Sequence, residues 1–177
     1  MKFLADRTTG KLAKKLRALG FDVLYRGESR IEEAVQAARA EGRMLLTRSR
    51  RIPAPEVDLQ VLILEANGPR DQVREVLEKL RLEQPQGKYF TRCLLCNEEL
   101  RPATKGEVEG RVPDFIFRGH DFFHRCPRCR RVYWPGTHLE KMRQEVDRIL
   151  SGEDQRPGKT GDRTTRGLGR RKEAGKE

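Results

Sequence analysis

The sequence lacks a long apolar run: no stretch approaches the roughly 20 apolar residues that a membrane-spanning helix requires. Its first residues, Met1 to Arg7, bring in charges before an apolar signal core can form. Cysteine is scarce, and the four that occur fall into two close pairs. These features predict a cytoplasmic protein without a membrane segment, in which paired cysteines indicate metal binding before a disulfide.

Acidic residues are outnumbered by basic ones. The 177-residue chain carries 38 lysines and arginines against 27 aspartates and glutamates, which gives a formal net charge of +11. Such an excess is typical of proteins with a polyanionic partner, most often nucleic acid. General solubility is the alternative explanation, because 37% of the residues are charged.

In the first half of the chain, short apolar runs alternate with amphipathic segments. The spacing predicts strands over residues 2–5, 21–25, 44–46 and 61–64, and helices over 10–19, 32–41 and 69–82. In the first helix, Leu12, Leu16 and Leu19 form the apolar stripe, and the basic residues, Arg17 included, occupy the remaining surface. Strands alternating with helices predict a small α/β domain with a parallel sheet.

Composition suggests where this domain ends. The polar residues before position 88 form a connector, so we expect an α/β domain at 1–87 and a second unit at 88–151. The second unit contains the cysteines and ends in a helix predicted over 138–150. Residues 152–177 are rich in glycine, arginine, lysine and threonine, and we expect them to form a disordered basic tail.

The cysteines have the spacing of a four-thiolate metal site. Cys93 and Cys96 form one C-x2-C pair, and Cys126 and Cys129 form the second. Each pair directs two thiolates from a tight turn toward one ion, and two such turns complete a tetrahedron. We therefore predict a zinc ribbon whose Zn²⁺ is structural, because four protein ligands close its coordination shell. An iron–sulfur cluster or a redox pair is the alternative.

Basic residues in both units are candidates for contact with nucleic acid. Arginines around the cysteines alternate with aromatic residues, a combination that suits phosphate contact and base stacking. Alternatively, the aromatic rings fill the ribbon core and the basic loops are ordinary solvated surface. The candidate residues for RNA binding are Arg7, Lys11, Arg48, Arg50 and Arg51 in the first unit and Arg128, Arg130 and Arg131 in the second.

Several stretches together carry a family resemblance. They are residues 3–7, 10–13, 16–23, 41–48, 92–97 and 126–129, and the run 132–138, which contains Tyr-Trp-x-Gly-x-His. With these stretches the chain resembles the Mut-seven C-terminal RNase domain family, a PIN-like nuclease fold that carries a zinc ribbon. The resemblance spans about residues 3–150. It implies an RNA-directed nuclease fold in which acidic residues at the strand ends bind Mg²⁺ or Mn²⁺.

Only one acidic residue of the family pattern is present. Asp6 stands at the family's first acidic position and is therefore the candidate catalytic residue. Ser49 replaces the aspartate of a Thr-Arg-Asp sequence, and Arg30 and Ile31 replace a pair of aspartates. Glu28, Glu32 and Asp58 are the remaining candidates for a substitute carboxylate. Asp6 also has a plain structural interpretation, in which it caps the following helix or pairs with Arg7 or Lys11.

Together these features predict an RNA-binding protein of the PIN-like ribonuclease type with a degenerate catalytic site. One alternative is an active metal-dependent ribonuclease, which would use Asp6 with non-standard carboxylates and bound Mg²⁺ or Mn²⁺. A second is an adaptor whose zinc ribbon docks a protein partner. Steep salt dependence of binding would distinguish nucleic-acid binding from the adaptor, because neutralised phosphates release counterions.

Overall fold

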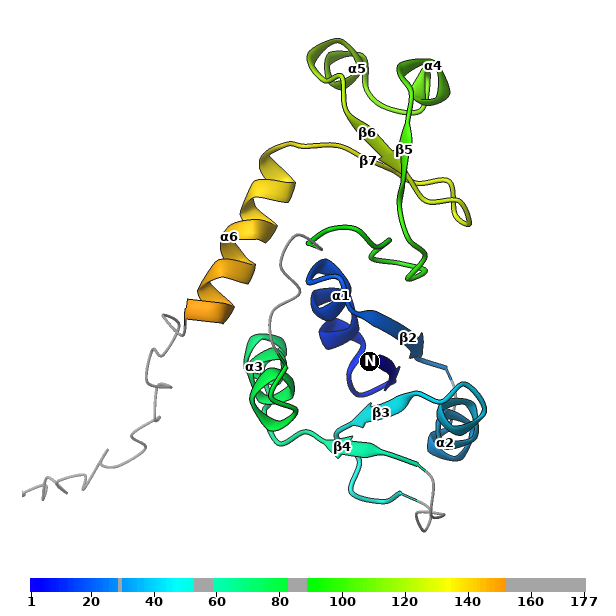
Figure 1. Cartoon of the computed structure of the whole chain (residues 1–177), viewed down its shortest axis with the longest axis vertical. Coiled ribbons are helices and arrows are strands. Elements are labelled where there is room, and N and C mark those ends of the chain that lie inside the picture. The colour runs from blue at the N-terminus through cyan, green and yellow to red at the C-terminus, as the bar shows by residue number, and fades with distance from the viewer. Residues whose placement is uncertain (29, 53–58, 83–88, 152–177) are drawn as a thin grey trace, which may run out of the picture.

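The computed structural model describes residues 1–28, 30–52, 59–82 and 89–151 of the chain. Figure 1 shows a sheet unit, made by the described residues of 1–82, and a smaller ribbon, residues 89–136, joined back to it by a helix. The predicted domain boundary near residue 87 and the predicted tail at 152–177 lie outside the described residues. None of the described helices combines the length and the apolar character needed to span a membrane.

A four-stranded parallel sheet forms the centre of the sheet unit. Its strands are β1 (Lys2–Asp6), β2 (Asp22–Arg26), β3 (Met44–Thr47) and β4 (Val61–Ile63), in the order β2-β1-β3-β4. The chain passes from β1 to β2 at one edge of the sheet, and from β3 to β4 at the opposite edge. Since the connections diverge between neighbouring β1 and β3, a crevice is expected at the carboxyl ends of these two strands.

Helices cover both faces of this sheet. The helices α1 (Gly10–Ala18) and α3 (Pro69–Lys79) pack on one face, and α2 (Ile31–Ala40) packs on the other (Figure 1). Phe3 and Ala5 of β1 point into the core with α1 and α3, whereas Leu4 points toward α2. Burial on both faces explains why β1 is a continuous apolar run and not an alternating one.

The three helices of the sheet unit end in the same kind of turn. Gly20, Gly42 and Arg81, which follow α1, α2 and α3, have φ values of 92°, 59° and 48°, all in the left-handed region. In each turn the next backbone N–H reaches back into the helix, as when Leu82 N donates to Leu77 O at 2.9 Å. The α3 helix therefore ends at Lys79, three residues before its predicted end at residue 82, because Arg81 adopts the conformation that glycine supplies elsewhere.

The predicted order of strands and helices is confirmed, and the other predicted bounds agree to within one residue. One expectation about the first helix is wrong. Arg17 was expected on the exposed surface, yet it is only 3% exposed. The ribbon covers this position, so the periodicity of the helix alone could not identify the side chain as buried.

The ribbon is built on a second, antiparallel sheet. Its strands are β5 (Arg101–Ala103), β6 (Phe123–Arg125) and β7 (Val132–Tyr133), in that order, and the short helices α4 (Lys105–Val108) and α5 (Asp114–Gly119) lie between β5 and β6. Val108 and Phe123 form its small core, against which Trp134 packs. Some of the aromatic residues thus fill the core, as one sequence interpretation held, whereas Phe122 is 76% exposed.

A long helix, α6 (Thr137–Ser151), returns from the ribbon to the sheet unit (Figure 1). Val146 and Ile149 enter the core formed by α1 and α3. On the surface, the carboxylate of Glu145 accepts hydrogen bonds from Lys15 Nζ at 2.6 Å and Arg70 Nε at 2.9 Å. Lys15, opposed by partial burial and assisted by Arg70, lowers the pKa of Glu145 below its ordinary value.

Replacing Glu145 with glutamine should weaken the docking of α6. Because its pKa is lower in the folded chain, the charged carboxylate stabilises the fold above the unfolded-state pKa, and this contribution is lost as pH falls through the folded-state pKa. At pH 7 we expect Glu145→Gln to lower the free energy of unfolding by about 1 kcal/mol, with little difference from wild type at strongly acidic pH. Urea unfolding across pH measures both values.

The matched control is Glu140→Gln, on the same helix. Glu140 is exposed and forms no ion pair with another described residue. Its replacement should leave stability nearly unchanged at every pH. Equal effects of the two substitutions would show that the contacts of Glu145 with Lys15 and Arg70 do not hold α6 in place.

Candidate functional site

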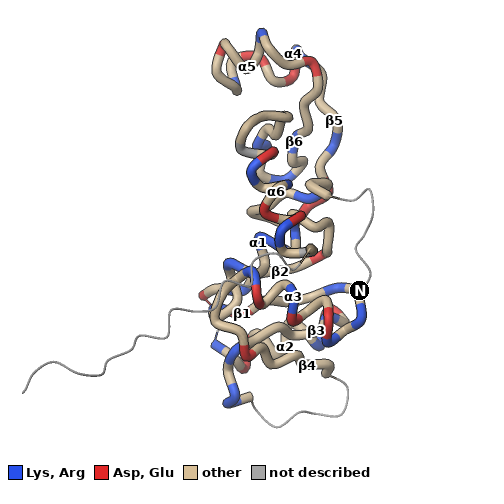
Figure 2. The backbone as a smooth tube through the Cα atoms, turned by 90° about the vertical axis from the view of Figure 1, so that its left-hand side faces the viewer, with Lys and Arg blue, Asp and Glu red and all other residues tan. Residues whose placement is uncertain are grey.

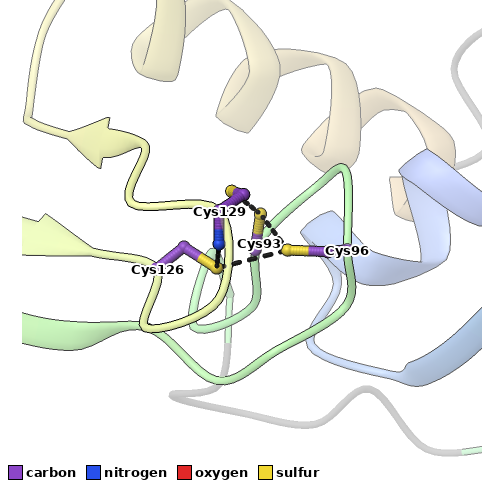
Figure 3. Close-up of side chains that lie close together, drawn as sticks. All are labelled: Cys93, Cys96, Cys126 and Cys129. Atoms are coloured by element: carbon purple, nitrogen blue, oxygen red, sulfur yellow. Dashed lines mark hydrogen bonds between the residues drawn. The ribbon is translucent and has the colours of Figure 1, made fainter.

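The four cysteines meet on two turns of the ribbon, on the side near α1, as Figure 3 shows. Their Sγ atoms all lie within 4.8 Å of one another. The separations are 3.4 Å for Cys93–Cys96, 3.2 Å for Cys96–Cys126 and 3.6 Å for Cys93–Cys129. A tetrahedral zinc ion with bonds of about 2.3 Å spaces its sulfur ligands about 3.8 Å apart. Four cysteines at these distances can hold one Zn²⁺.

The two cysteine pairs sit on turns of matching geometry. In the first turn, Asn97 N donates to Cys93 O at 2.9 Å, and in the second, Arg130 N donates to Cys126 O at 3.0 Å. Asn97 and Arg130 both have left-handed backbone, with φ of 69° and 60°. Each turn therefore brings two sulfurs to one side, which explains why the C-x2-C spacing predicts the cluster.

The surroundings of the sulfurs favour a cation among them. Burial raises the pKa of the Cys93 thiol, but hydrogen bonds from the Tyr133 hydroxyl and the nearby backbone outweigh it and hold that pKa at about 6. Burial raises the pKa of Cys96, and hydrogen bonds with the neighbouring sulfurs of Cys126 and Cys93 raise it further. A divalent cation offsets this crowding, because it stabilises all four groups as thiolates.

A buried arginine attaches the first cysteine turn to the sheet unit. Arg17, on α1, donates from Nε to Val23 O and from one terminal nitrogen to Leu94 O and Leu95 O, each at 2.8 Å. Burial lowers the pKa of this guanidinium, and the nearby cysteine sulfurs counteract that effect. Leu94 and Leu95 lie between the two cysteines of the first pair, so Arg17 links the metal centre directly to α1 and β2.

A second polar contact covers the exposed edge of the parallel sheet. The side chain of Asn97 accepts from Val23 N at 2.9 Å and donates to Asp22 Oδ1 at 2.7 Å. Arg43 donates to the same oxygen at 2.6 Å. Burial raises the pKa of Asp22, but the bonds from Arg43 and Asn97 prevail and lower it. Asn97, which follows the first cysteine pair, thus supplies a hydrogen-bond acceptor to Val23 N on the free edge of β2.

The second candidate site lies at the carboxyl ends of β1 and β3. Asp6 is 3% exposed there. Its Oδ1 accepts from Thr8 N at 2.9 Å, and its Oδ2 accepts from Thr47 Oγ1 at 2.6 Å. The hydroxyl of Thr9 lies 3.3 Å from Oδ1 and donates to Leu46 O at 3.0 Å. Asp6 therefore joins the ends of two neighbouring strands at the expected crevice, and it forms no ion pair with a described residue.

This donor set does not fit a catalytic Mg²⁺ or Mn²⁺. Such ions require clustered oxygen ligands, chiefly carboxylates. Across the described part of the chain, the only group of three or more histidine, cysteine and acidic side chains able to hold a metal is the cysteine group. Glu28 and Glu32 are described and join no such group, whereas Asp58 lies outside the described residues.

The predicted RNA-binding residues fall into two groups, and all of them are exposed. The first group follows β1 and β3 in the chain and lies near the sheet edge that holds Asp6. The second group belongs to the second cysteine turn, on the ribbon. The first group contains Arg7, Lys11, Arg48, Arg50 and Arg51, and the second contains Arg128, Arg130 and Arg131. Arg48 also donates to the Asn67 side chain, which joins the segments after β3 and β4.

Three further residues were not identified from the sequence. Nothing in the sequence indicated that Arg17 is buried, since two of its three acceptors, Leu94 O and Leu95 O, lie on a distant segment. Asn97 directly follows the first cysteine pair, and this position was the available clue. The side chain of Tyr25 is 45% exposed and lies beside the start of α1. A Cβ atom on Gly10 would come within 2.7 Å of the Tyr25 ring. Glycine at the start of that helix thus leaves room for an exposed aromatic ring at the sheet edge.

Comparison with known proteins gives one match. A family model described as the Mut7-C RNAse domain matches residues 1–146, which include both the sheet edge and the cysteine centre. No curated protein and no solved structure matches the chain. Because the family model covers most of the chain, the protein belongs to this family, and the resemblance seen in the sequence is confirmed. Membership indicates a nuclease-like, RNA-related function.

The cysteine centre predicts one zinc ion per chain. Cys126→Ser should lose this metal, because Cys126 is buried and supplies one of the four sulfurs. The ribbon should then lose its fixed structure, since a structural zinc site contributes folding free energy. Elemental analysis of the purified chain measures the metal, and near-ultraviolet circular dichroism follows the ribbon through Trp134.

His124→Ala is the matched control. His124 is exposed on β6 and belongs to the same sheet as the second cysteine turn, but it is not part of the cysteine group. This variant should retain one zinc ion. Full zinc retention by Cys126→Ser, or loss of zinc from His124→Ala, would contradict the four-cysteine site.

Proposed function

We propose that this member of the Mut7-C RNAse domain family binds RNA without cleaving it. The observation that carries the proposal is the state of Asp6, the one residue that keeps the family's acidic position. Its carboxylate is buried and both of its oxygens accept hydrogen bonds from the chain's own threonines. No described carboxylate joins it in a metal-binding group.

Cleavage of a phosphodiester needs a group that activates water and a charge that stabilises the transition state. In nucleases of this type, carboxylate-bound metal ions supply both. The hydroxyls of Thr47 and Ser49 stand near the end of β3, where they cannot replace charged metal ligands. The carboxylate of Asp6 is instead occupied by hydrogen bonds from threonines, which hold the ends of β1 and β3 together. The chemistry available at this edge supports a structural role for Asp6.

The same edge remains favourable for RNA. Within the described residues, the exposed basic side chains after β1 and β3 form no ion pair with a carboxylate, so a phosphate backbone would meet positive charge that no partner neutralises. Tyr25 adds an exposed ring on which a base can stack. The ribbon contributes a second group of exposed arginines. We propose that the predicted domains 1–87 and 88–151 contact RNA together and that the protein works in the cytoplasm, with a structural Zn²⁺.

Two alternatives follow from the same residues. An active ribonuclease would need Asp6 to release its threonine partners and to recruit a carboxylate from outside the described residues, such as Asp58. A protein adaptor would use the ribbon surface and would not need the basic residues at the sheet edge. The net charge of +11 favours RNA over a protein partner.

Binding and cleavage can be separated with labelled single-stranded RNA and the zinc-loaded chain. We expect binding without added divalent metal, with an affinity that falls steeply as salt rises. Contact with about five phosphates would give a slope of about −3.5 in log K against log salt. With Mg²⁺ or Mn²⁺ the RNA should remain intact, and Asp6→Asn should bind it as well as wild type does if the fold is retained.

The opposite results have distinct meanings. Mn²⁺-dependent cleavage by wild type that disappears in Asp6→Asn would establish an active nuclease and overturn the proposal. Absence of binding at low salt, or an affinity that does not change with salt, would exclude RNA as the partner and favour the adaptor. Circular dichroism of Asp6→Asn supplies the check that the variant is folded.

A further inference from the structure

A large groove lies between the two parts of the molecule. Its volume is about 1660 Å³, and its walls come from α1, α6, the segment that follows residue 88 and the ribbon. Figure 1 shows α1 and α6 side by side below the ribbon, and the α6–α3 contacts confirm that α6 lies against the sheet unit. Residues remote in sequence, such as Lys14, Leu95 and Trp134, therefore line one continuous surface.

The groove leads toward the sheet edge that holds Asp6. Lys11 and Lys14 line it along α1, and Lys11 follows Gly10, the first residue of that helix. Gly68 and Pro69 line it at the start of α3. Both helices begin at the carboxyl edge of the parallel sheet, since each follows a strand of that sheet. One end of the groove thus lies at the starts of α1 and α3, and the other lies against the ribbon.

The lining combines apolar rings with basic groups. Five aromatic side chains between residues 89 and 134 line the groove: Tyr89, Phe90, Phe115, Tyr133 and Trp134. Phe115 is 73% exposed, although it is a large apolar residue. An exposed ring in such a place has little role in the fold and suits contact with a ligand.

The charge of the groove is positive. Six lysines and arginines line it against three acidic residues. Two of those acidic residues already have basic partners, because Glu145 binds Lys15 and Arg70, and Asp71 binds Arg74. Within the described residues, no ion pair neutralises Lys11, Lys14 or Arg131. In Figure 2, basic positions recur along the tube from the sheet unit through α1 and α6.

We propose that this groove holds single-stranded RNA along the path from the ribbon to the sheet edge. Aromatic rings and flexible cations in one groove match unpaired bases and the phosphates between them. In this arrangement Lys11, Lys14 and Arg131 contact phosphates, and Phe115 stacks with a base. The inference rests on the proposed RNA binding and adds the route of the strand, which links the two groups of basic residues identified above.

An apolar peptide is the competing occupant of such a groove. A peptide would use the rings but would gain little from the unpaired lysines, so its binding would depend weakly on salt. RNA would contact both the aromatic rings and the lysines. Loss of the lysines would change the affinity and its salt dependence, whereas loss of a ring would change the affinity alone. Two variants in the full, zinc-loaded chain therefore test the proposal: Lys11→Ala with Lys14→Ala, and Phe115→Ser.

The measurement is fluorescence anisotropy of a labelled oligouridylate across a range of salt concentrations. The double lysine variant should bind about tenfold or more weakly, and its salt slope should become shallower by about 1.4, since each phosphate contributes about 0.7 for a single strand. Phe115→Ser should lower affinity about tenfold through lost stacking and should leave the slope unchanged. Both sites are exposed, so the variants are expected to fold.

Arg111→Ala with Arg118→Ala is the matched control. Both arginines are exposed on the ribbon and outside the groove lining, and the substitutions remove the same amount of charge as the lysine pair. The control should keep the wild-type slope. If wild type binds RNA but the lysine pair behaves like this control and Phe115→Ser has no effect, the groove is not the route, while the proposed function stands. If wild type does not bind at all, the proposed function itself fails.

Discussion

The buried guanidinium of Arg17 determines where the ribbon sits on the sheet unit. This one side chain donates hydrogen bonds to Val23 O on β2 and to two carbonyls of the first cysteine turn, Leu94 O and Leu95 O. Without it these acceptors would lose their partners, at a cost of about 1–3 kcal/mol for each one left buried. The turn that presents these carbonyls lies between Cys93 and Cys96, so a metal ion bound by the cysteines would stabilise the same turn that docks the ribbon.

The rest of the proposed surface follows from this constraint. The ribbon is held at one end by Arg17 and Asn97, and at the other by α6, whose Val146 and Ile149 enter the main core. Both ends are attached to the same unit, and a groove lies between them. Among the described residues, the carboxyl edge of the sheet holds no group of acidic side chains able to bind a metal, and exposed basic residues follow its strands.

Local patterns accounted for much of this structure. Apolar runs such as that of β1 and the stripe of Leu12, Leu16 and Leu19 specified the parallel sheet and its helices, and C-x2-C spacing specified the cysteine cluster. Contacts between distant segments could not be predicted in this way. The burial of Arg17 depends on residues 94 and 95, and the bond from Thr47 to Asp6 becomes visible only when β1 and β3 are neighbours. The groove depends on the path of α6, which periodicity predicts as a helix but does not place.

The most direct test of the account is hydrogen–deuterium exchange of the full, zinc-loaded chain with and without single-stranded RNA. A strand that runs from the ribbon to the sheet edge should slow exchange at the start of α1 and in the ribbon segment around Tyr133 and Trp134, both of which line the groove. Slower exchange in these two separated regions together would support one continuous binding surface. Slower exchange in only one of them, or in neither, would contradict the central claim that the ribbon and the sheet unit bind RNA as one body.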